Sequence, residues 1–181
     1  MKVVLDSGQI NASIAKLTDS IASLAGAKAE IAIIGIRSRG EVLAQRLTKS
    51  LSKKLNTPIP CGTLDITLYR DDINDPQGEG QPTVRSTEIP FDISGMTIIL
   101  VDDVLHTGRS VRAAMDALMD FGRPRMVQVV SLVDRGHREL PIKLDYVGKN
   151  VPTRAGETVR LQGANGSLEP PLEVVVVGGQ T

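Results

Sequence analysis

The chain has 181 residues, 41% of them hydrophobic, and its 21 Lys and Arg residues balance 21 Asp and Glu residues to a formal net charge of zero. This size predicts one globular domain, residues 1–181, and the zero charge argues against a protein that only coats nucleic acid. One cysteine excludes an internal disulfide and a zinc-binding cysteine set, and 2% aromatic residues argue against a stacking platform for single-stranded nucleic acid.

The predicted elements begin with an amphipathic helix near the N-terminus. Asp6 or Ser7 is its expected N-cap, because either side chain can accept a hydrogen bond from the first free amides of a helix. The apolar residues of this helix alternate steps of four and three, at Ile10, Ile14, Leu17, Ile21 and Leu24.

A first strand-loop-helix unit is predicted over residues 31–55. Residues 31–36 are predicted to form a buried strand, and residues 37–40 a short polar loop. The helix after the loop carries leucines four residues apart, at Leu43, Leu47, Leu51 and Leu55. Arg39 lies in the short loop, so we expect it at the ligand-binding edge of the sheet.

A second strand is predicted at residues 64–69, and residues 70–90 after it lack hydrophobic periodicity. Compact domains seldom keep so long an irregular connection unless it binds or covers a ligand. We interpret it as a mobile, hairpin-like flap; the alternative is a disordered insertion without a role. Arg70 and Arg85 either travel with this flap and meet a pyrophosphate group or are solvated surface charges.

The most informative segment is residues 98–110, in which a predicted strand ends in two carboxylates and leads through a small-residue loop into a helix. Four successive apolar residues, Ile98 to Val101, predict a strand in the middle of a parallel sheet. Gly122 is the expected end of the helix. Its apolar residues lie three and four apart, at Val111, Ala114, Met115, Leu118 and Phe121.

This corner has the chemistry to hold a phosphorylated sugar. Residues 107–110 supply two hydroxyls, a guanidinium and the first free amides of the helix, which together attract a phosphate dianion. Asp102 and Asp103 repel phosphate but accept hydrogen bonds from sugar hydroxyls. The segment matches neither a P-loop nor the G-x-G-x-x-G pattern. The alternative is an ordinary strand-loop-helix corner whose acids are solvated or cap the helix.

A strand predicted at residues 126–133 completes the alternation of strands and helices. This order predicts an α/β domain whose parallel sheet is covered on both faces, with ligands at the carboxyl ends of the strands. The tail has predicted strands at residues 158–162 and 172–177 around a turn at Asn165-Gly166, which would form an antiparallel pair or a small hood.

Residues 98–110 resemble the segment by which type I phosphoribosyltransferases bind phosphoribosyl pyrophosphate (PRPP). Residues 35–40, 64–72, 132–142 and 146–153 are similar to the PyrR family, pyrimidine operon attenuators that also act as uracil phosphoribosyltransferases. The resemblance implies the type I phosphoribosyltransferase fold: a mostly parallel twisted sheet with helices on both faces, a flexible flap and a small C-terminal hood.

The resemblance also implies the site. Ser38, Arg39 and Gly40 would form the pyrophosphate loop, while Asp102 and Asp103 would hold the ribose hydroxyls and act with Arg39 as the catalytic residues. His106 stands where relatives often have Tyr, and we expect a tolerated substitution rather than a catalytic base. The remaining nucleotide-binding residues implied by the family are Val104, Leu105, His106, Thr107, Gly108, Arg109, Ser110, Arg135 and Val159.

The reaction implied by the family is uracil plus PRPP giving UMP and pyrophosphate. Cleavage at C1 of PRPP builds positive charge on the sugar and negative charge on the leaving pyrophosphate, so positioning and electrostatics replace a nucleophile. The implied cofactor is Mg²⁺, held by PRPP and water rather than directly by the protein. A closing flap would keep water from hydrolysing PRPP.

The second role implied by the family is binding to the leader RNA of pyrimidine genes, with UMP or PRPP biasing the RNA-competent form. Candidate RNA contacts are Lys16, His137, Arg138 and Lys149. The N-terminal helix departs from the family pattern, because Ala15 and Asp19 stand where Thr and His would be expected. Since a carboxylate repels the RNA backbone, reduced affinity, lost affinity and a different target all stay open.

Enzyme and RNA-binding regulator are therefore two hypotheses that can both hold. An enzyme without RNA binding is one alternative, and a purine phosphoribosyltransferase is a weaker one, because residues 134–142 match the pyrimidine regulators. No apolar run is long enough to span a membrane, and no signal-peptide pattern is present, so we expect a cytoplasmic protein without membrane contact. The family implies a homo-oligomer, a dimer or higher.

Overall fold

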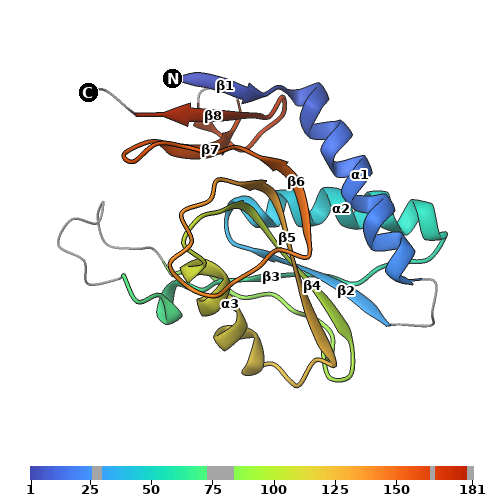
Figure 1. Cartoon of the computed structure of the whole chain (residues 1–181). Coiled ribbons are helices and arrows are strands. Elements are labelled where there is room, and N and C mark those ends of the chain that lie inside the picture. The colour runs from blue at the N-terminus through green and yellow to red at the C-terminus, as the bar shows by residue number, and fades with distance from the viewer. Residues whose placement is uncertain (26–29, 73–83, 164–165, 179–181) are drawn as a thin grey trace.

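The computed structural model describes residues 1–25, 30–72, 84–163 and 166–178 (Figure 1). The elements of these residues, in chain order, are β1 (Lys2–Leu5), α1 (Ser7–Ala25), β2 (Ile31–Ile36), α2 (Arg39–Leu55), β3 (Cys61–Leu64), the short 3-10 helix η1 (Thr67–Tyr69), β4 (Thr97–Leu105), α3 (Arg109–Met119), β5 (Met126–Asp134), β6 (Tyr146–Asn150), β7 (Thr158–Gln162) and β8 (Glu173–Val177).

Five of the described strands form a parallel sheet in the order β3-β2-β4-β5-β6, which confirms the predicted α/β class. Alternate residues of the central strands enter two different cores, because side chains of a strand point to opposite faces. Ile33 and Ile99 pack in one core with α1 and α2, whereas Ile34 and Leu100 pack in the other with α3. Helices thus cover both faces of the sheet, as predicted.

The predicted N-terminal helix is confirmed as α1, and Asp6 is its N-cap. The Asp6 carboxylate accepts a hydrogen bond from the amide of Gln9 at 2.8 Å, and the Gln9 side chain accepts one from the amide of Asp6 at 3.0 Å. This reciprocal pair is a capping box, which satisfies two amides at once.

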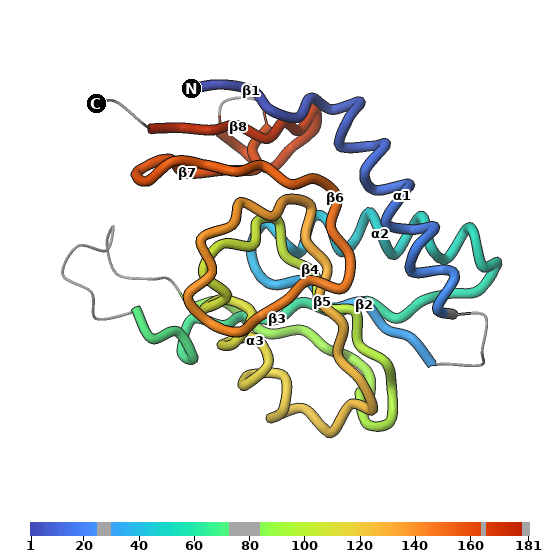
Figure 2. The backbone as a smooth tube through the Cα atoms, in the orientation of Figure 1, coloured from blue at the N-terminus to red at the C-terminus, as the bar shows by residue number. Residues whose placement is uncertain are grey.

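A second, antiparallel sheet of order β1-β8-β7 forms the predicted hood (Figure 2). The two tail strands were predicted, but β1 was not. The hood faces the carboxyl ends of the parallel strands: Arg39, just after β2, donates to the carbonyl of Leu161, and Arg135, just after β5, donates to the carbonyl of Glu157. A ligand at that edge therefore lies between the large sheet and the hood.

The prediction of a strand at residues 64–69 is wrong. The chain instead forms β3, which pairs with β2, and then turns into η1. Asp65 causes this turn, because its carboxylate accepts hydrogen bonds from the amide of Thr67 at 3.1 Å and from the Thr67 hydroxyl at 2.6 Å. A short acidic side chain that bonds nearby backbone competes with strand pairing.

Part of the predicted flap, residues 73–83, lies outside the described residues. The returning end of the flap is bonded to the sheet, because the backbones of Glu88 and Thr63 exchange two hydrogen bonds of 2.8 Å. Of the predicted tail turn, Asn165 also lies outside the described residues. Gly166 adopts a positive φ of 75° and donates its amide to the carbonyl of Gly163, as a turn requires.

Two other boundaries differ from the predictions, and one further strand, β6, was not predicted. β4 continues through the two aspartates to Leu105, because these residues keep pairing with β5. α3 ends at Met119, and Phe121 is exposed rather than packed on the helix face. The sequence of β6 mixes a glycine with polar residues, so it lacks a clear strand pattern. β6 is an edge strand of the large sheet, in which it pairs with β5.

Candidate functional site

Two cavities lie side by side at the carboxyl end of β4. The larger cavity has a volume of about 380 Å³ and the smaller about 300 Å³, and they share Arg70, Val104 and Ser110 in their linings. The larger cavity is also lined by Asp71, Asp72, Leu105, His106, Thr107, Gly108, Arg109 and Glu139, and the smaller by Ile36, Arg37, Ser38, Arg39, Ile66, Asp102 and Asp103.

The smaller cavity contains the predicted carboxylate pair. Burial raises the pKa of Asp102 well above that of a solvated aspartate, and the charge of the adjacent Asp103 raises it further. Burial also raises the pKa of Asp103, while hydrogen bonding and the charge of Arg39 act against the rise. Two carboxyl groups that resist ionisation together are suited to accept and donate hydrogen bonds to hydroxyl groups or to meet a cation.

The predicted phosphate loop lies at the N-terminus of α3, in the larger cavity. Gly108 has a φ of 95°, and a Cβ added to it would come within 2.9 Å of Ile142. The loop therefore needs glycine both for its backbone conformation and for its packing. The N-cap residue Gly108 provides no side-chain cap, and the Thr107 hydroxyl accepts a hydrogen bond from the amide of Arg109 at 3.2 Å. Amides of that turn are available to an anion.

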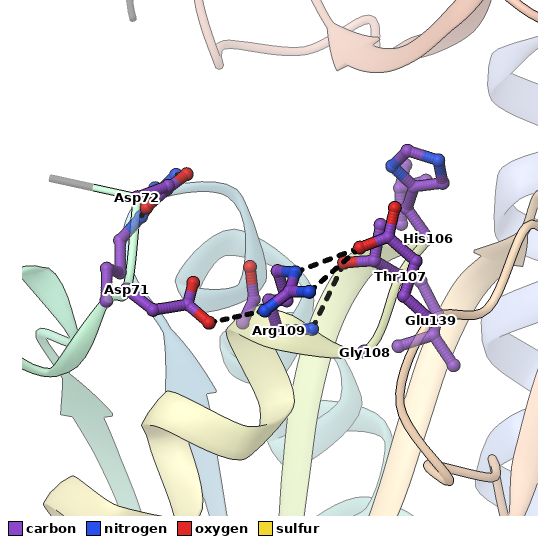
Figure 3. Close-up of a pocket in the computed structure, with 11 residues that line it drawn as sticks. Asp71, Asp72, His106, Thr107, Gly108, Arg109 and Glu139 are labelled. Atoms are coloured by element: carbon purple, nitrogen blue, oxygen red, sulfur yellow. Dashed lines mark hydrogen bonds and ion pairs between the residues drawn. The ribbon is translucent and has the colours of Figure 1, made fainter. Parts of the chain in front are cut away.

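Arg109 of this loop is held by two carboxylates from different parts of the chain (Figure 3). Its Nη1 donates to Asp71, which follows η1, and its Nε donates to Glu139 at 3.0 Å. These hydrogen bonds raise the pKa of the guanidinium further, the bond to Asp71 most of all. Sequence reasoning missed both acids, although each lies in a segment similar to the PyrR family.

The loop after β2 approaches the smaller cavity with Arg37, Ser38 and Arg39. Arg39 donates from Nε to the carbonyl of Leu161 at 3.0 Å, so the hood holds it in place. Gly40 allows α2 to begin against β4, because a Cβ there would come within 2.5 Å of the carbonyl oxygen of Val101. Arg37 was not predicted as a site residue; it donates to the hydroxyl of Thr63 at 2.9 Å.

The two flap arginines occupy different places. Arg70 lies between the two cavities and is paired with Asp72. Arg85 lines neither of them; it borders a separate cavity of about 180 Å³ beside the end of α3, and its amide donates to Asp65. The described structure thus brings only Arg70 to the predicted site.

Arg135 and Val159 do not line either cavity. Both are buried between the large sheet and the hood, where Arg135 donates to the Thr153 hydroxyl at 3.2 Å and to the carbonyl of Glu157 at 2.6 Å. Burial lowers the pKa of this guanidinium. In the present arrangement Arg135 holds the hood near the site.

His106 lines the larger cavity, and Figure 3 shows its ring turned away from Arg109. Its ring meets the ring of His137 edge to face, with centroids 6.1 Å apart. Burial lowers the pKa of His106, and the charge of Arg135 and the neighbouring His137 lower it further. The lowered pKa favours the neutral imidazole, which does not act as a general acid toward a ligand.

Three of the four residues predicted to contact RNA make hydrogen bonds within the protein. Arg138 bonds Asp134 and the carbonyls of Ile142 and His106. The other bonds are those of Lys149 to the carbonyl of Val4 at 3.1 Å and of His137 to the carbonyl of Thr153 at 2.8 Å. Lys16 is exposed on α1.

Asp19, the acid that departs from the family pattern, is paired with Lys54 of α2 at 2.8 Å. Its negative charge is therefore partly neutralised on the surface that α1 and α2 share.

A magnesium ion at this site would rely on its substrate for most of its ligands. Within residues 1–25, 30–72, 84–163 and 166–178, no three or more His, Cys, Asp and Glu side chains gather closely enough to hold a metal. Mg²⁺ is typically bound through one or two carboxylates together with phosphate oxygens and water. The Asp102–Asp103 pair beside the smaller cavity fits that mode. None of the described helices is long and apolar enough to cross a membrane.

Comparison with known sequences finds a match to the family described as "Phosphoribosyl transferase domain" over residues 2–162. The chain is 49% identical over 170 residues to "Bifunctional protein PyrR" of Roseiflexus sp. (strain RS-1), covering 93% of this chain and 92% of that protein. It is 48% identical over 180 residues to the protein of the same name from Chloroflexus aurantiacus, covering 98% and 96% of the two chains.

Among solved structures, the fold is similar to that of the hypoxanthine phosphoribosyltransferase of Trypanosoma cruzi in complex with the product IMP. The TM-score is 0.72 at 17% identity, and the match covers 98% of this chain and 94% of that one. Another hypoxanthine-guanine phosphoribosyltransferase, from Bacillus anthracis, matches with a TM-score of 0.72 at 16% identity over 98% and 97% of the chains. At these identities the likeness concerns the fold.

Proposed function

Since the chain belongs to the phosphoribosyl transferase domain family, and within it to the PyrR family, we propose how the PyrR-type function is distributed over its two cavities. That function joins uracil phosphoribosyltransferase activity with the regulation of pyrimidine genes. In the enzyme reaction, N1 of uracil forms a bond to C1 of PRPP as the bond from C1 to pyrophosphate breaks. The N1 proton passes to pyrophosphate or water, and UMP and pyrophosphate leave.

The observation that carries this proposal is the adjacency of the two cavities across Val104 and Ser110. The larger cavity has the open N-terminus of α3 and Arg109 for the 5′-phosphate. The smaller cavity has the aspartate pair for the ribose hydroxyls and Arg39 for the pyrophosphate. PRPP, whose ribose lies between its 5′-phosphate and its pyrophosphate, can span the two adjacent cavities.

The residues of the site act by position and charge. Asp102 and Asp103 bind the 2′- and 3′-hydroxyls by hydrogen bonds, and an ionised carboxylate of this pair stabilises the positive charge that develops on the sugar as the C1 bond breaks. Arg39 and Arg37 offset the charge that accumulates on the leaving pyrophosphate, and Ser38 donates to it. Mg²⁺, when bound, supplies further positive charge at the pyrophosphate oxygens.

The proposal is tested by incubating the protein with PRPP, Mg²⁺ and each of uracil, hypoxanthine, guanine and orotate. We expect UMP and pyrophosphate with uracil and no nucleotide with the other three bases. A nucleotide formed from hypoxanthine or guanine would instead support the purine alternative, which the solved structures of similar fold do not themselves support because of their low identity.

We also propose that the chain regulates pyrimidine genes by binding their leader RNA, and that UMP in the site biases the RNA-competent form. The word "Bifunctional" in the names of the curated relatives supports this role. The pairing of Asp19 with Lys54 supports it further, because it lessens the repulsion expected from that acid. Binding to the leader RNA that is no tighter than binding to unrelated RNA, with and without UMP, would contradict this role. The chain would then be an enzyme without RNA binding.

A single domain over residues 1–181, a homo-oligomeric state and a cytoplasmic location belong to the same proposal. The family match over residues 2–162 supports the single domain. Sedimentation of the purified protein measures the oligomeric state, and fractionation of the host cells measures the location.

A further inference from the structure

The larger cavity contains more negative than positive side chains, although the proposed ligand at this place is a phosphate dianion. Its described lining has two guanidinium groups, Arg70 and Arg109, and three carboxylates, Asp71, Asp72 and Glu139. A cavity of this balance repels an anion unless some of the carboxylates give up their arginine partners. The carboxylates therefore need an explanation beyond that of a simple anion site.

Both guanidinium groups are already occupied by carboxylates of the protein. Arg70 is paired with Asp72, and Arg109 is held by Asp71 and Glu139 together. In Figure 3, Asp71 and Glu139 reach Arg109 from opposite sides. A carboxylate and a phosphate group bind the same donor hydrogens of a guanidinium, so a ligand competes with Glu139 for Nε and Nη2 of Arg109 and with Asp71 for Nη1.

The acids are positioned to exchange with a ligand. The side chains of Arg109, Asp71 and Glu139 are 43%, 37% and 55% exposed, so each bond competes with water and is weak by itself. The backbone of the Glu139 segment is fixed independently: the amides of Glu139 and Leu140 donate to the carbonyl of Thr107 at 3.0 and 3.1 Å. The carboxylate of Glu139 can thus leave Arg109 while its backbone stays attached to the phosphate loop.

On the basis of the proposed function, we propose that Asp71 and Glu139 are internal competitors for Arg109 that set the affinity of the site for the 5′-phosphoryl group of PRPP and UMP. In the free protein they neutralise Arg109, and a bound phosphoryl group takes the guanidinium from them. A fraction of the binding free energy is spent on this exchange, which keeps the affinity for the product UMP low enough for its release. Both acids are positioning residues, since they act through Arg109.

The test is the effect of Asp71→Asn and Glu139→Gln on the dissociation constants of inorganic phosphate, UMP and PRPP, measured by titration calorimetry. Each substitution should tighten binding of all three ligands by about threefold to fivefold at low salt, since each frees Arg109 from one weak ion pair. For PRPP, KM should fall while the kcat of the uracil reaction falls or stays constant, because UMP leaves more slowly. Tighter binding is a result that partial unfolding does not produce.

Asp116→Asn is the matched control. On α3, Asp116 forms an ion pair with Arg112, with 3.1 Å between Oδ2 and Nη2. Asp116 lines neither cavity. This substitution removes a similar exposed ion pair and should leave all three dissociation constants unchanged. In Arg109→Ala, the additional change Glu139→Gln should no longer tighten phosphate binding, because the two acids act only through that arginine.

Weaker binding in Asp71→Asn and Glu139→Gln would overturn the proposal, because the acids would then be holding Arg109 in its binding position. Affinities equal to those of Asp116→Asn would overturn it as well. The titrations with inorganic phosphate test the competition at Arg109 without any nucleotide. If the wild-type protein binds phosphate but neither PRPP nor UMP, the proposed function fails, and the phosphate titrations of the variants still test the competition.

Discussion

Arg39, the first residue of α2, donates a hydrogen bond to the backbone carbonyl of Leu161 in β7, 122 residues later in the chain. This bond joins the proposed pyrophosphate loop to the hood. The same guanidinium faces the smaller cavity beside the aspartate pair, and its charge opposes the rise that burial causes in the pKa of Asp103. One side chain therefore links the hood, the leaving-group loop and the ribose-binding acids.

We expect Arg39→Ala to lower the kcat of the uracil reaction by about two orders of magnitude, since it removes a donor aimed at the charge that develops on pyrophosphate. The measurement is steady-state release of pyrophosphate. Arg46→Ala is the control, because Arg46 lies on the same helix but contacts Asn11 and lines neither cavity. Equal rates in the two variants would show that Arg39 has no part in the reaction.

We expect Gly108→Ala to destabilise the protein and weaken UMP binding. The backbone at φ 95° costs a non-glycine residue about 1–3 kcal/mol, and the added methyl group meets Ile142 at 2.9 Å, an overpacking that costs about as much again. Unfolding in urea measures the loss. Gly95→Ala is the control: its φ is 78°, but a Cβ there meets nothing within 4 Å, so only the backbone cost should appear. Equal losses in the two variants would disprove the packing argument.

Asp102→Asn should separate activity from stability. Because the pKa of Asp102 is raised in the folded protein, its ionised form disfavours folding, and its stabilising contribution is present at low pH and lost as pH rises through the folded pKa. The variant, which stays neutral, should therefore unfold at a higher urea concentration than the wild type at pH 8 and show no gain near pH 3. Its activity should fall by about tenfold to a hundredfold, the value of a charged hydrogen bond to ribose.

Asp92→Asn should change the stability at pH 8 in the opposite direction. Hydrogen bonds from Ser94 lower the pKa of Asp92, so its ionised form favours folding above the unfolded pKa and the contribution is lost as pH falls. This exposed variant should be slightly less stable than the wild type at pH 8 and should keep full activity. A gain in stability at pH 8 for both variants would refute the assigned role of burial at Asp102.

Asp19→Ala should tighten binding to the leader RNA. The change frees Lys54 from its ion pair and removes a negative charge from the surface of α1 and α2. We expect the slope of log affinity against log salt to steepen by about one, the effect of one further phosphate contact. Filter binding over a range of salt concentrations measures it, with Lys16→Ala expected to change the slope in the opposite direction. An unchanged slope in both variants would place the RNA on another face.

The central part of the fold was predictable because its signals are local. The apolar run of β4 and the three-and-four spacing of α3 are consequences of burial on both sides of a sheet, so they are visible in the sequence itself. The position of the phosphate loop follows from those two elements. The sequence alone therefore predicts that residues 102–110 lie at one edge of the sheet.

The missed features depend on contacts between distant residues. β1 is short and half exposed, and it becomes a strand only by pairing with β8. η1 replaced a predicted strand because the side chain of Asp65 bonds the backbone of Thr67, which outweighs a favourable strand composition. The carboxylates on Arg109 come from segments 38 and 30 residues away, a separation at which no periodicity operates.

The pairing of β1 with β8 has a consequence for how the protein matures. During synthesis the first strand leaves the ribosome long before its partner exists, so the hood is completed only after the large sheet can already have formed. A nascent chain halted before residue 173 has the aspartate pair and the phosphate loop but no finished cover above them. The hood can therefore close over the site only after β8 has been synthesised.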